Sequence, residues 1–270
     1  MFHNTWPFIG SLGRLVEVPF TASESVSRAD RYVESTTVEG VRRVQVRPAA
    51  PRSWSVDVRG ASAGELSGLA AFAQGAWGAG PWHWVSVQAQ RGNLLTPREA
   101  ALVDVVPASF WALSGPVVDA DGVLQARSLS VSLASGWAAP WRDIPVLPGR
   151  RVMWAADVAG VDGPALALAF FDVDGVQVGG FYGTARAAAG MSRVSMYAVA
   201  PAGAATVRVG VQPSVLSLTR PQVTWTDGPV PYSAGHGCRA AVVDGFSEDL
   251  LVANSSGTYS SIGFTVLEVG

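Results

Sequence analysis

The chain has 270 residues, of which 49% are hydrophobic and 15% charged, with 30 glycines and 17 prolines. This composition is too apolar for a disordered chain, and its glycines and prolines interrupt it too often for a helical bundle. The net charge of −2 gives no electrostatic reason to expect a nucleic-acid partner. No run of about 18 apolar residues occurs, which argues against a membrane span.

The numbers of cysteine and lysine residues exclude several kinds of catalytic and binding site. Cys238 is the only cysteine, so no internal disulfide can form, and the start of the chain lacks the basic and apolar regions of a signal peptide. Both observations predict synthesis in a reducing cytoplasm. All 19 basic residues are arginine. Without lysine there is no phosphate-binding lysine of a P-loop, no Schiff base and no Ser-Lys dyad, and we expect no cofactor.

The first part of the chain alternates between apolar and polar residues, with one helical interruption. Trp54, Val56 and Val58 share one face of a predicted strand. A helix is predicted to begin at Ser62, because Glu65 three residues later completes a capping box. Leu66, Leu69, Ala70 and Ala73 then recur at helical spacing, and Gly75 and Gly78 end the helix. Strands are predicted at 14–20, 42–48, 53–60 and 82–90.

From about residue 105 short strands follow one another without a helical pattern. Asp121-Gly122 and Asp174-Gly175 have the sequence of tight hairpin turns. Short, regularly spaced strands are typical of a β-sandwich, and here we expect a jelly roll. The predicted strands are 117–123, 124–133, 152–158, 165–183, 193–201 and 206–213, with two more within 238–246 and 259–270.

One motif invites an enzymatic interpretation. "GASAG" at 60–64 is a literal G-x-S-x-G between a strand and a helix, and Asp227 and His236 follow Ser62 in the order of a hydrolase triad. An α/β-hydrolase needs several helices around a parallel sheet, whereas the pattern predicts one helix. Ser62 is also already explained as a helix cap. We therefore assign no catalytic residue, and keep a serine hydrolase as a remote alternative.

No side chain is assigned to a metal site, and a structural calcium held mainly by backbone carbonyls of the jelly roll stays an open alternative. His236 and Cys238 form the only close pair of soft ligands, and they fit a turn that enters a strand. "DVDG" at 172–175 resembles a calcium loop, but the acidic ligand downstream is missing. This stretch is predicted to be a hairpin turn.

Aromatic residues in the second region raise the question of sugar binding, because sugars stack on exposed rings. Trp141, Tyr182 and Trp225 lie beside glycine, proline or polar residues and are the candidate glycan contacts. The alternative for each ring is packing in the core, where most tryptophan surface is buried.

Three stretches together resemble a known family. "ASAGELSGLAAFAQGAWGAGPWHWVSVQAQRGNLLTPREAAL" is similar to the N-terminal region of distal-tail-type minor tail proteins of long-tailed phages that infect actinobacteria. "WRDIPVLPGRRVMWAADVAG" with "ALALAFFDVDGVQVGG" resembles the carbohydrate-binding-module-like jelly rolls that such proteins carry. "TDGPVPYSAGHGCRAAVVDGFSEDL" and "YSSIGFTVLEVG" resemble their closing strands.

The resemblance implies a mainly β chain, in which a tail-tube-like β-sandwich with one helix carries an inserted jelly-roll β-sandwich. Residues 1–104 and 235–270 would form the ring-building domain, and 105–234 the insert. Trp82 and Trp84 would anchor the sheet under the helix, and the segment from Asn93 to Leu102 would connect the domains.

The implied function is structural. The chain would form a ring, as a hexamer, that joins the tail tube protein to other tail-tip proteins in the virion tail. The alternative is a carbohydrate-binding adhesin that recognises a glycan of the host surface, in which the insert carries the function.

Overall fold

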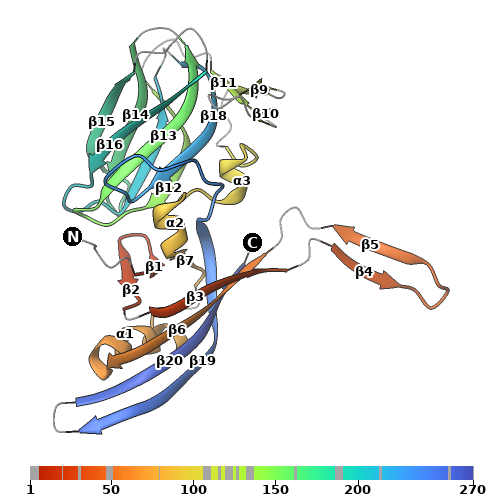
Figure 1. Ribbon diagram of the computed structural model, residues 1–270, viewed down its shortest axis with the longest axis vertical. Helices are drawn as coiled ribbons and strands as arrows, with labels where there is room; N and C mark the ends of the chain where they lie inside the picture. Colours follow the sequence, from red (N-terminus) through yellow and green to blue (C-terminus); the bar gives the residue numbers. More distant parts are fainter. Residues whose placement is uncertain are drawn as a thin grey trace. The chain divides into compact units, whose positions relative to one another are not determined.

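The computed structural model describes residues 6–19, 21–29, 32–46, 51–78, 80–105, 111–114, 117–118, 124–125, 128–131, 137–160, 163–185, 191–212, 215–254 and 257–269. The fold is mainly β, as expected (Figure 1). Contacts divide the chain into two compact units. The sheet unit comprises Met1–Gly10, Val16–Trp84 and Arg239–Gly270, and the insert unit comprises Ser11–Leu15 and Val85–Cys238. The sequence had suggested boundaries at 104/105 and 234/235.

A seven-stranded sheet forms most of the sheet unit, in the order β2-β1-β7-β19-β20-β6-β3. A separate two-stranded sheet lies between β3 and β6 in the sequence (Figure 1). The seven strands are β1 (Phe8–Ser11), β2 (Arg14–Glu17), β3 (Thr21–Arg28), β6 (Arg52–Ser62), β7 (Trp82–Val85), β19 (Cys238–Asn254) and β20 (Gly257–Glu268), and the separate pair is β4 (Tyr32–Thr36) and β5 (Arg42–Val46).

The two ends of the chain share this sheet. β20 pairs antiparallel with β6, and Val266 lies opposite Trp54. Both side chains are buried, because alternate residues of the two strands face the same core. The guanidinium of Arg52 holds the carboxylate of Glu268 with two hydrogen bonds of 2.9 and 2.7 Å. This bidentate pair fixes the register at one end of the two strands.

The predicted helix is α1 (Ala63–Ala73), and its apolar stripe packs toward the core of the sheet unit. Leu66, Leu69 and Phe72 are almost completely buried. Each of the helices in the described part of the chain is much shorter than the roughly 20 residues that a membrane span requires.

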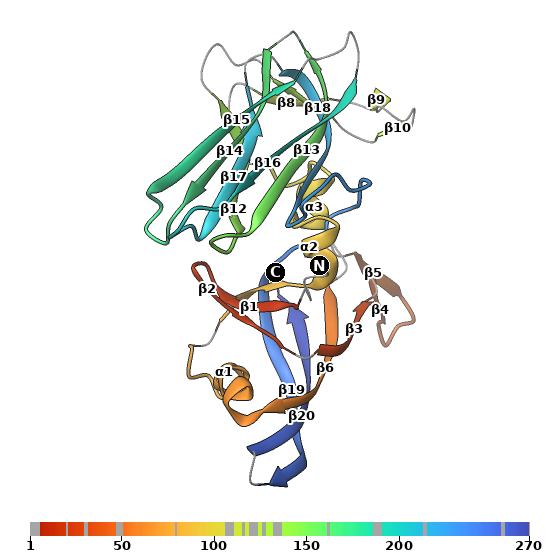
Figure 2. The same ribbon diagram turned by 60° about the vertical axis from the view of Figure 1, so that its left-hand side comes forward.

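The insert unit is a jelly-roll-like sandwich of two antiparallel sheets (Figure 2). The five-stranded sheet has the order β16-β13-β18-β11-β8, and the four-stranded sheet has the order β12-β17-β14-β15. Trp154 joins the sheets, because its indole N–H donates to the carbonyl of Gly210 at 2.9 Å. The strands are β8 (Trp111–Ser114), β11 (Ser128–Val131), β12 (Ala138–Pro145), β13 (Arg151–Gly160), β14 (Gly163–Phe171), β15 (Gln177–Ala185), β16 (Ser192–Val199), β17 (Thr206–Val211) and β18 (Val215–Thr224).

Hairpin turns close several of these strand pairs. The run predicted at 165–183 is the hairpin β14–β15, and its turn is held by Asp172, whose carboxylate accepts from the N–H of Asp174 and of Val176. The other predicted turn, Asp121-Gly122, lies outside the described residues. Its flanking strands, β9 (Val117–Val118) and β10 (Leu124–Gln125), pair antiparallel.

The strand predicted at 82–90 is wrong beyond Val85. Ser86 caps a short helix, α2 (Val87–Arg91), by accepting the N–H of Ala89 at 2.9 Å. A second short helix, α3 (Pro97–Ala100), follows within the segment expected to be a connector between the domains. Thr96 caps it in a complete capping box with Glu99. The serine and threonine caps satisfy helical N–H groups that a strand would have to pair with a neighbour.

The chain enters and leaves the insert unit through neighbouring strands of the seven-stranded sheet. β7, which leads into the insert, and β19, which follows it, are neighbours in the seven-stranded sheet. Within the insert unit, His236 and Gly237 donate their N–H groups to the carbonyls of Asn93 and Leu95, each at 2.9 Å. The approach is so close that a Cβ on Gly237 would lie 1.9 Å from the carbonyl oxygen of Leu94. Adjacent entry and exit strands are the geometry of an inserted domain.

Candidate functional site

Ser62 and Glu65 form the expected capping box. The N–H of Ser62 donates to the Glu65 carboxylate at 2.9 Å, and the N–H of Glu65 donates to the Ser62 hydroxyl at 3.5 Å. The same hydroxyl donates to the carboxylate at 2.6 Å. These bonds from Ser62 lower the pKa of the Glu65 carboxyl below its usual value. The contribution of Glu65 to stability is therefore full above the ordinary glutamate pKa and is lost as the pH falls through the lowered one.

Substitution of Ser62 separates the structural role from a catalytic one. Ser62→Ala removes the cap and should lower the free energy of unfolding by about 0.5–2 kcal/mol, measured by urea denaturation. Ser62→Asp should keep near wild-type stability, because aspartate caps equally well and suits the positive end of the helix. We expect no hydrolysis of a nitrophenyl ester by any of the three proteins. Turnover by the wild type that disappears in both variants would identify Ser62 as a nucleophile instead.

Trp82 and Trp84 both belong to the core of the sheet unit. Trp82 meets Phe72 of α1 edge to face, with ring centroids 5.3 Å apart, and so joins β7 to the helix. Trp84 is 1% exposed and packs against Trp54 of β6, with centroids 6.4 Å apart. The crowded tryptophans therefore fill the space between β6, β7 and α1.

The three candidate glycan contacts are not equivalent. Trp141 was expected to be exposed, but its side chain in β12 is only 1% exposed. Its ring packs edge to face on Trp154, with ring centroids 5.4 Å apart. Its indole N–H donates to the carbonyl of Glu99 at 3.3 Å. A ring buried between two sheets has no face for a sugar, so this expectation is wrong. Trp225 is partly exposed just after β18. Tyr182 lies in β15 opposite Ala167, and its side chain is outside the described residues.

The structure also places residues that were considered for a hydrolase triad or a metal site. The hydroxyl of Ser233 lies 2.8 Å from Nε2 of His236, within the passage that leaves the insert. Cys238 is buried. Among the described residues, no three His, Cys, Asp or Glu side chains gather where they could hold a metal ion.

An ion cluster that the sequence analysis missed lies on the five-stranded sheet. Asp157 of β13 is completely buried, and it accepts hydrogen bonds from Arg220 of β18 at 2.7 Å and from Arg193 of β16 at 3.2 Å. Burial lowers the pKa of Arg193, and the charge of Asp157 opposes that effect. Both guanidinium groups also lie over the ring of Tyr232.

Side-chain amides beside this cluster tie together segments within the insert unit. Gln222 accepts from Arg193 and donates to the carbonyls of Gly92 and Pro231, at 2.8 and 2.9 Å. The side-chain amide of Asn93 donates to the carbonyls of Pro221 and Ser233, at 3.0 and 3.1 Å. Buried polar groups of this kind are costly unless each is paired, so the network specifies one path for these segments.

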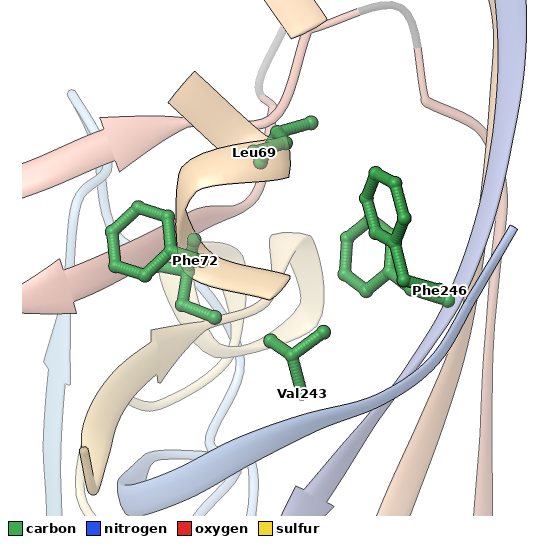
Figure 3. A pocket seen from close by; sticks show the side chains of 6 residues that line it. Leu69, Phe72, Val243 and Phe246 are labelled. Carbon is green, nitrogen blue, oxygen red and sulfur yellow. The ribbon is translucent and has the colours of Figure 1, made fainter. Parts of the chain in front are cut away.

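An apolar groove lies where α1 meets β19 and β20 in the sheet unit. It is a shallow apolar depression that is partly open to solvent. Leu69 and Phe72 of α1 lie across from Val243 and Phe246 of β19 (Figure 3). We call it the seam groove. Its lining residues are Ile9, Leu69, Phe72, Val243, Phe246 and Phe264.

Two hairpins of the sheet unit expose apolar side chains. The β4–β5 hairpin, here called the arm, carries Val38, Val41 and Val44, which are 106%, 54% and 52% exposed. Leu250, Leu251 and Val252, near the tip of β19–β20, are 63%, 52% and 49% exposed. We take these two hairpins as candidate surfaces for contact with another molecule.

No protein-family model and no curated protein sequence matches the chain. Among solved structures, the enzymatically active domain of tailspike protein 4 from bacteriophage CBA120 is similar to 50% of this chain, at 16% identity and a TM-score of 0.38, over only 21% of the tailspike chain. A carbohydrate-binding module of Cellvibrio mixtus lichenase 5A, in complex with cellotriose, is similar to 46% of this chain and 92% of its own, at 16% identity and a TM-score of 0.32. Likenesses this distant assign neither a family nor a function.

Proposed function

We propose that this chain is a structural protein of the tail tip of a long-tailed actinobacteriophage. Its sheet unit associates with further copies into a ring, as a hexamer, which contacts the tail tube protein and other tail-tip proteins. The insert unit is displayed on this ring. The chain acts in the virion tail after synthesis in the host cytoplasm, and it has no enzymatic role.

The exposed apolar hairpins of the sheet unit carry this proposal. An isolated two-stranded hairpin is at best marginally stable in water, and the arm is a two-stranded sheet of its own. Its three exposed valines and the exposed tip of β19–β20 would be a liability on a monomer. Contact with neighbouring copies covers such surfaces, so the features favour an assembly protein over a free enzyme or adhesin.

The chain path and the sequence resemblance support the same proposal. The insert leaves and returns through the adjacent strands β7 and β19, so that the sheet is built from both ends of the chain. This is the arrangement implied by the resemblance to distal-tail-type proteins. The hydroxyl of Ser62 is engaged in the capping box, which supports a structural role for the G-x-S-x-G motif.

The assembly state of the purified full-length chain tests the proposal. We expect a closed ring in negative-stain images, and a mass that is a multiple of the monomer mass of 28.1 kDa in mass photometry. The ring should persist on dilution. Each subunit of a closed ring contacts two neighbours, so the release of one subunit breaks two interfaces. A chain that stays monomeric at every concentration would contradict the proposal, and glycan binding by such a monomer would favour the adhesin.

A further inference from the structure

Arg193 holds its guanidinium in a fixed position on β16 of the insert unit. Nη1 donates to the carboxylate of Asp157 at 3.2 Å and to the carbonyl of Arg220 at 2.7 Å, and Nη2 donates to the side-chain oxygen of Gln222. The guanidinium carbon also lies 5.5 Å from the centroid of the Tyr232 ring. A group held by this many contacts loses little further freedom when it binds a ligand.

The same guanidinium keeps donors for a further partner. Arginine has five N–H bonds, and the three contacts above leave the Nε–H and one Nη2–H of Arg193 without an acceptor among the described residues. Nε is not among the buried polar atoms that lack a partner, and 26% of the side chain is exposed, so solvent reaches this nitrogen. Nε and Nη2 form one edge of the planar group, and such an edge matches the two oxygens of a carboxylate.

Neighbouring charges compensate that of Arg193 only in part. Asp157 is completely buried, and its carboxylate is shared between Arg193 and Nε of Arg220, which lies 2.7 Å away. Burial lowers the pKa of Arg193, and repulsion by Arg220 acts in the same direction, so that the attraction of Asp157 does not restore the ordinary value. The charged form is therefore less stable here than in water, and an anion bound at the exposed edge would stabilise it.

We propose that Arg193 and Ser195 form a binding site for an acidic sugar, whose carboxylate lies against Nε and Nη2 of Arg193. Ser195 is exposed, and it shares a face of β16 with Arg193, because side chains two residues apart in a strand lie about 7 Å apart on one face. A sugar acid carries a carboxylate and several hydroxyl groups on one ring, so it can reach the guanidinium and the serine hydroxyl together. β16 is the outermost strand of its sheet, which leaves this row of side chains at an edge. The site goes beyond the proposed function and does not require a ring.

Calorimetric titration of the full-length chain at low ionic strength tests the site with three probes. We expect D-glucuronate to bind, and D-glucose and acetate to bind at least about tenfold more weakly, because glucose lacks the charge and acetate lacks the ring hydroxyls. Equal affinity for acetate and D-glucuronate would mean an adventitious ion only and would overturn the proposal. Equal affinity for D-glucose, or no binding of D-glucuronate, would overturn it as well.

Two kinds of substitution locate the binding. Arg193→Gln should weaken D-glucuronate binding by about tenfold or more, since hydrogen bonds from a charged donor are the strong ones. Arg193 also belongs to the cluster around Asp157, so a second variant leaves it in place. Ser195→Glu puts a carboxylate at the exposed position beside the guanidinium and should abolish binding. Val199→Glu, at a position that is 53% exposed on the same face of β16, adds the same charge farther away and should change the affinity by at most about twofold.

The outcomes separate this site from the proposed ring. Retained binding by Ser195→Glu would overturn the site, and so would an equal loss in Ser195→Glu and Val199→Glu, which would show a general effect of charge. Either result leaves ring assembly standing. A monomeric wild type that binds D-glucuronate would overturn the ring and support the site.

Discussion

Replacement of Asp157 by asparagine should lower the free energy of unfolding of the insert unit by about 3–5 kcal/mol, measured by urea denaturation. Asp157 is completely buried and is bonded to Arg220, which is 7% exposed. Asparagine has nearly the same shape but no charge, so the guanidinium of Arg220 would stay buried without its carboxylate. Removal of one partner from a buried ion pair costs more than the pair contributes, since the remaining charge has lost its water.

Two further variants make this prediction specific. Asp227→Asn, at an exposed position of the same unit, should change stability by at most about 0.5 kcal/mol. Arg220→Met in the Asp157→Asn background should recover part of the loss, because it removes one of the uncompensated charges. If the loss of stability in the double variant equalled the sum of the losses in Asp157→Asn and in Arg220→Met alone, the two residues would not be energetically coupled, contrary to the geometry.

Patterns confined to neighbouring residues predicted some of the local structure correctly and missed two short helices. The alternation of Trp54, Val56 and Val58 gave the buried face of β6, and Ser62 with Glu65 gave the start of α1. The same cap signal was present at Thr96, with Pro97 and Glu99, and would have predicted α3. It was missed because the resemblance to distal-tail-type proteins implied that the segment from Asn93 to Leu102 is a connector. At 82–90 an alternating pattern suggested one long strand, but the cap at Ser86 starts a helix there.

Features that depend on distant segments could not be found in this way. In the sequence, Trp141 stands beside proline and charged residues, which suggested that its ring is exposed. In the fold, Trp154 and Glu99 cover the ring. Asp157, Arg193 and Arg220 lie on three strands, and only the sheet order β16-β13-β18 brings them together. The seam groove likewise joins β1, α1, β19 and β20. A residue's partners across a sheet are set by topology, which a single sequence leaves open.

Deletion of residues 259–270 should unfold the sheet unit and abolish assembly. β20 lies between β19 and β6, so its loss leaves two rows of backbone groups without partners. The deletion also removes Ile262, Phe264 and Val266, which are at most 5% exposed, and it removes Glu268, the ion-pair partner of Arg52. Each large apolar side chain lost from a core lowers the free energy of unfolding by about 2–5 kcal/mol. The whole free energy of unfolding of a domain is only about 5–15 kcal/mol.

Hydrogen exchange followed by mass spectrometry measures this outcome strand by strand. Amides of β6 should exchange at the rate of an unfolded chain, whereas those of β13 and β14 should stay protected, because the insert unit has its own core around Trp154 and Phe170. Removal of Val269 and Gly270 alone is the matched control and should leave β6 protected, since Val269 is 37% exposed and lies beyond the last strand. Continued protection of β6 after the longer deletion would mean that the N-terminal strands form a sheet without the C-terminal segment. The two ends of the chain would then not depend on one another for the core of the sheet unit.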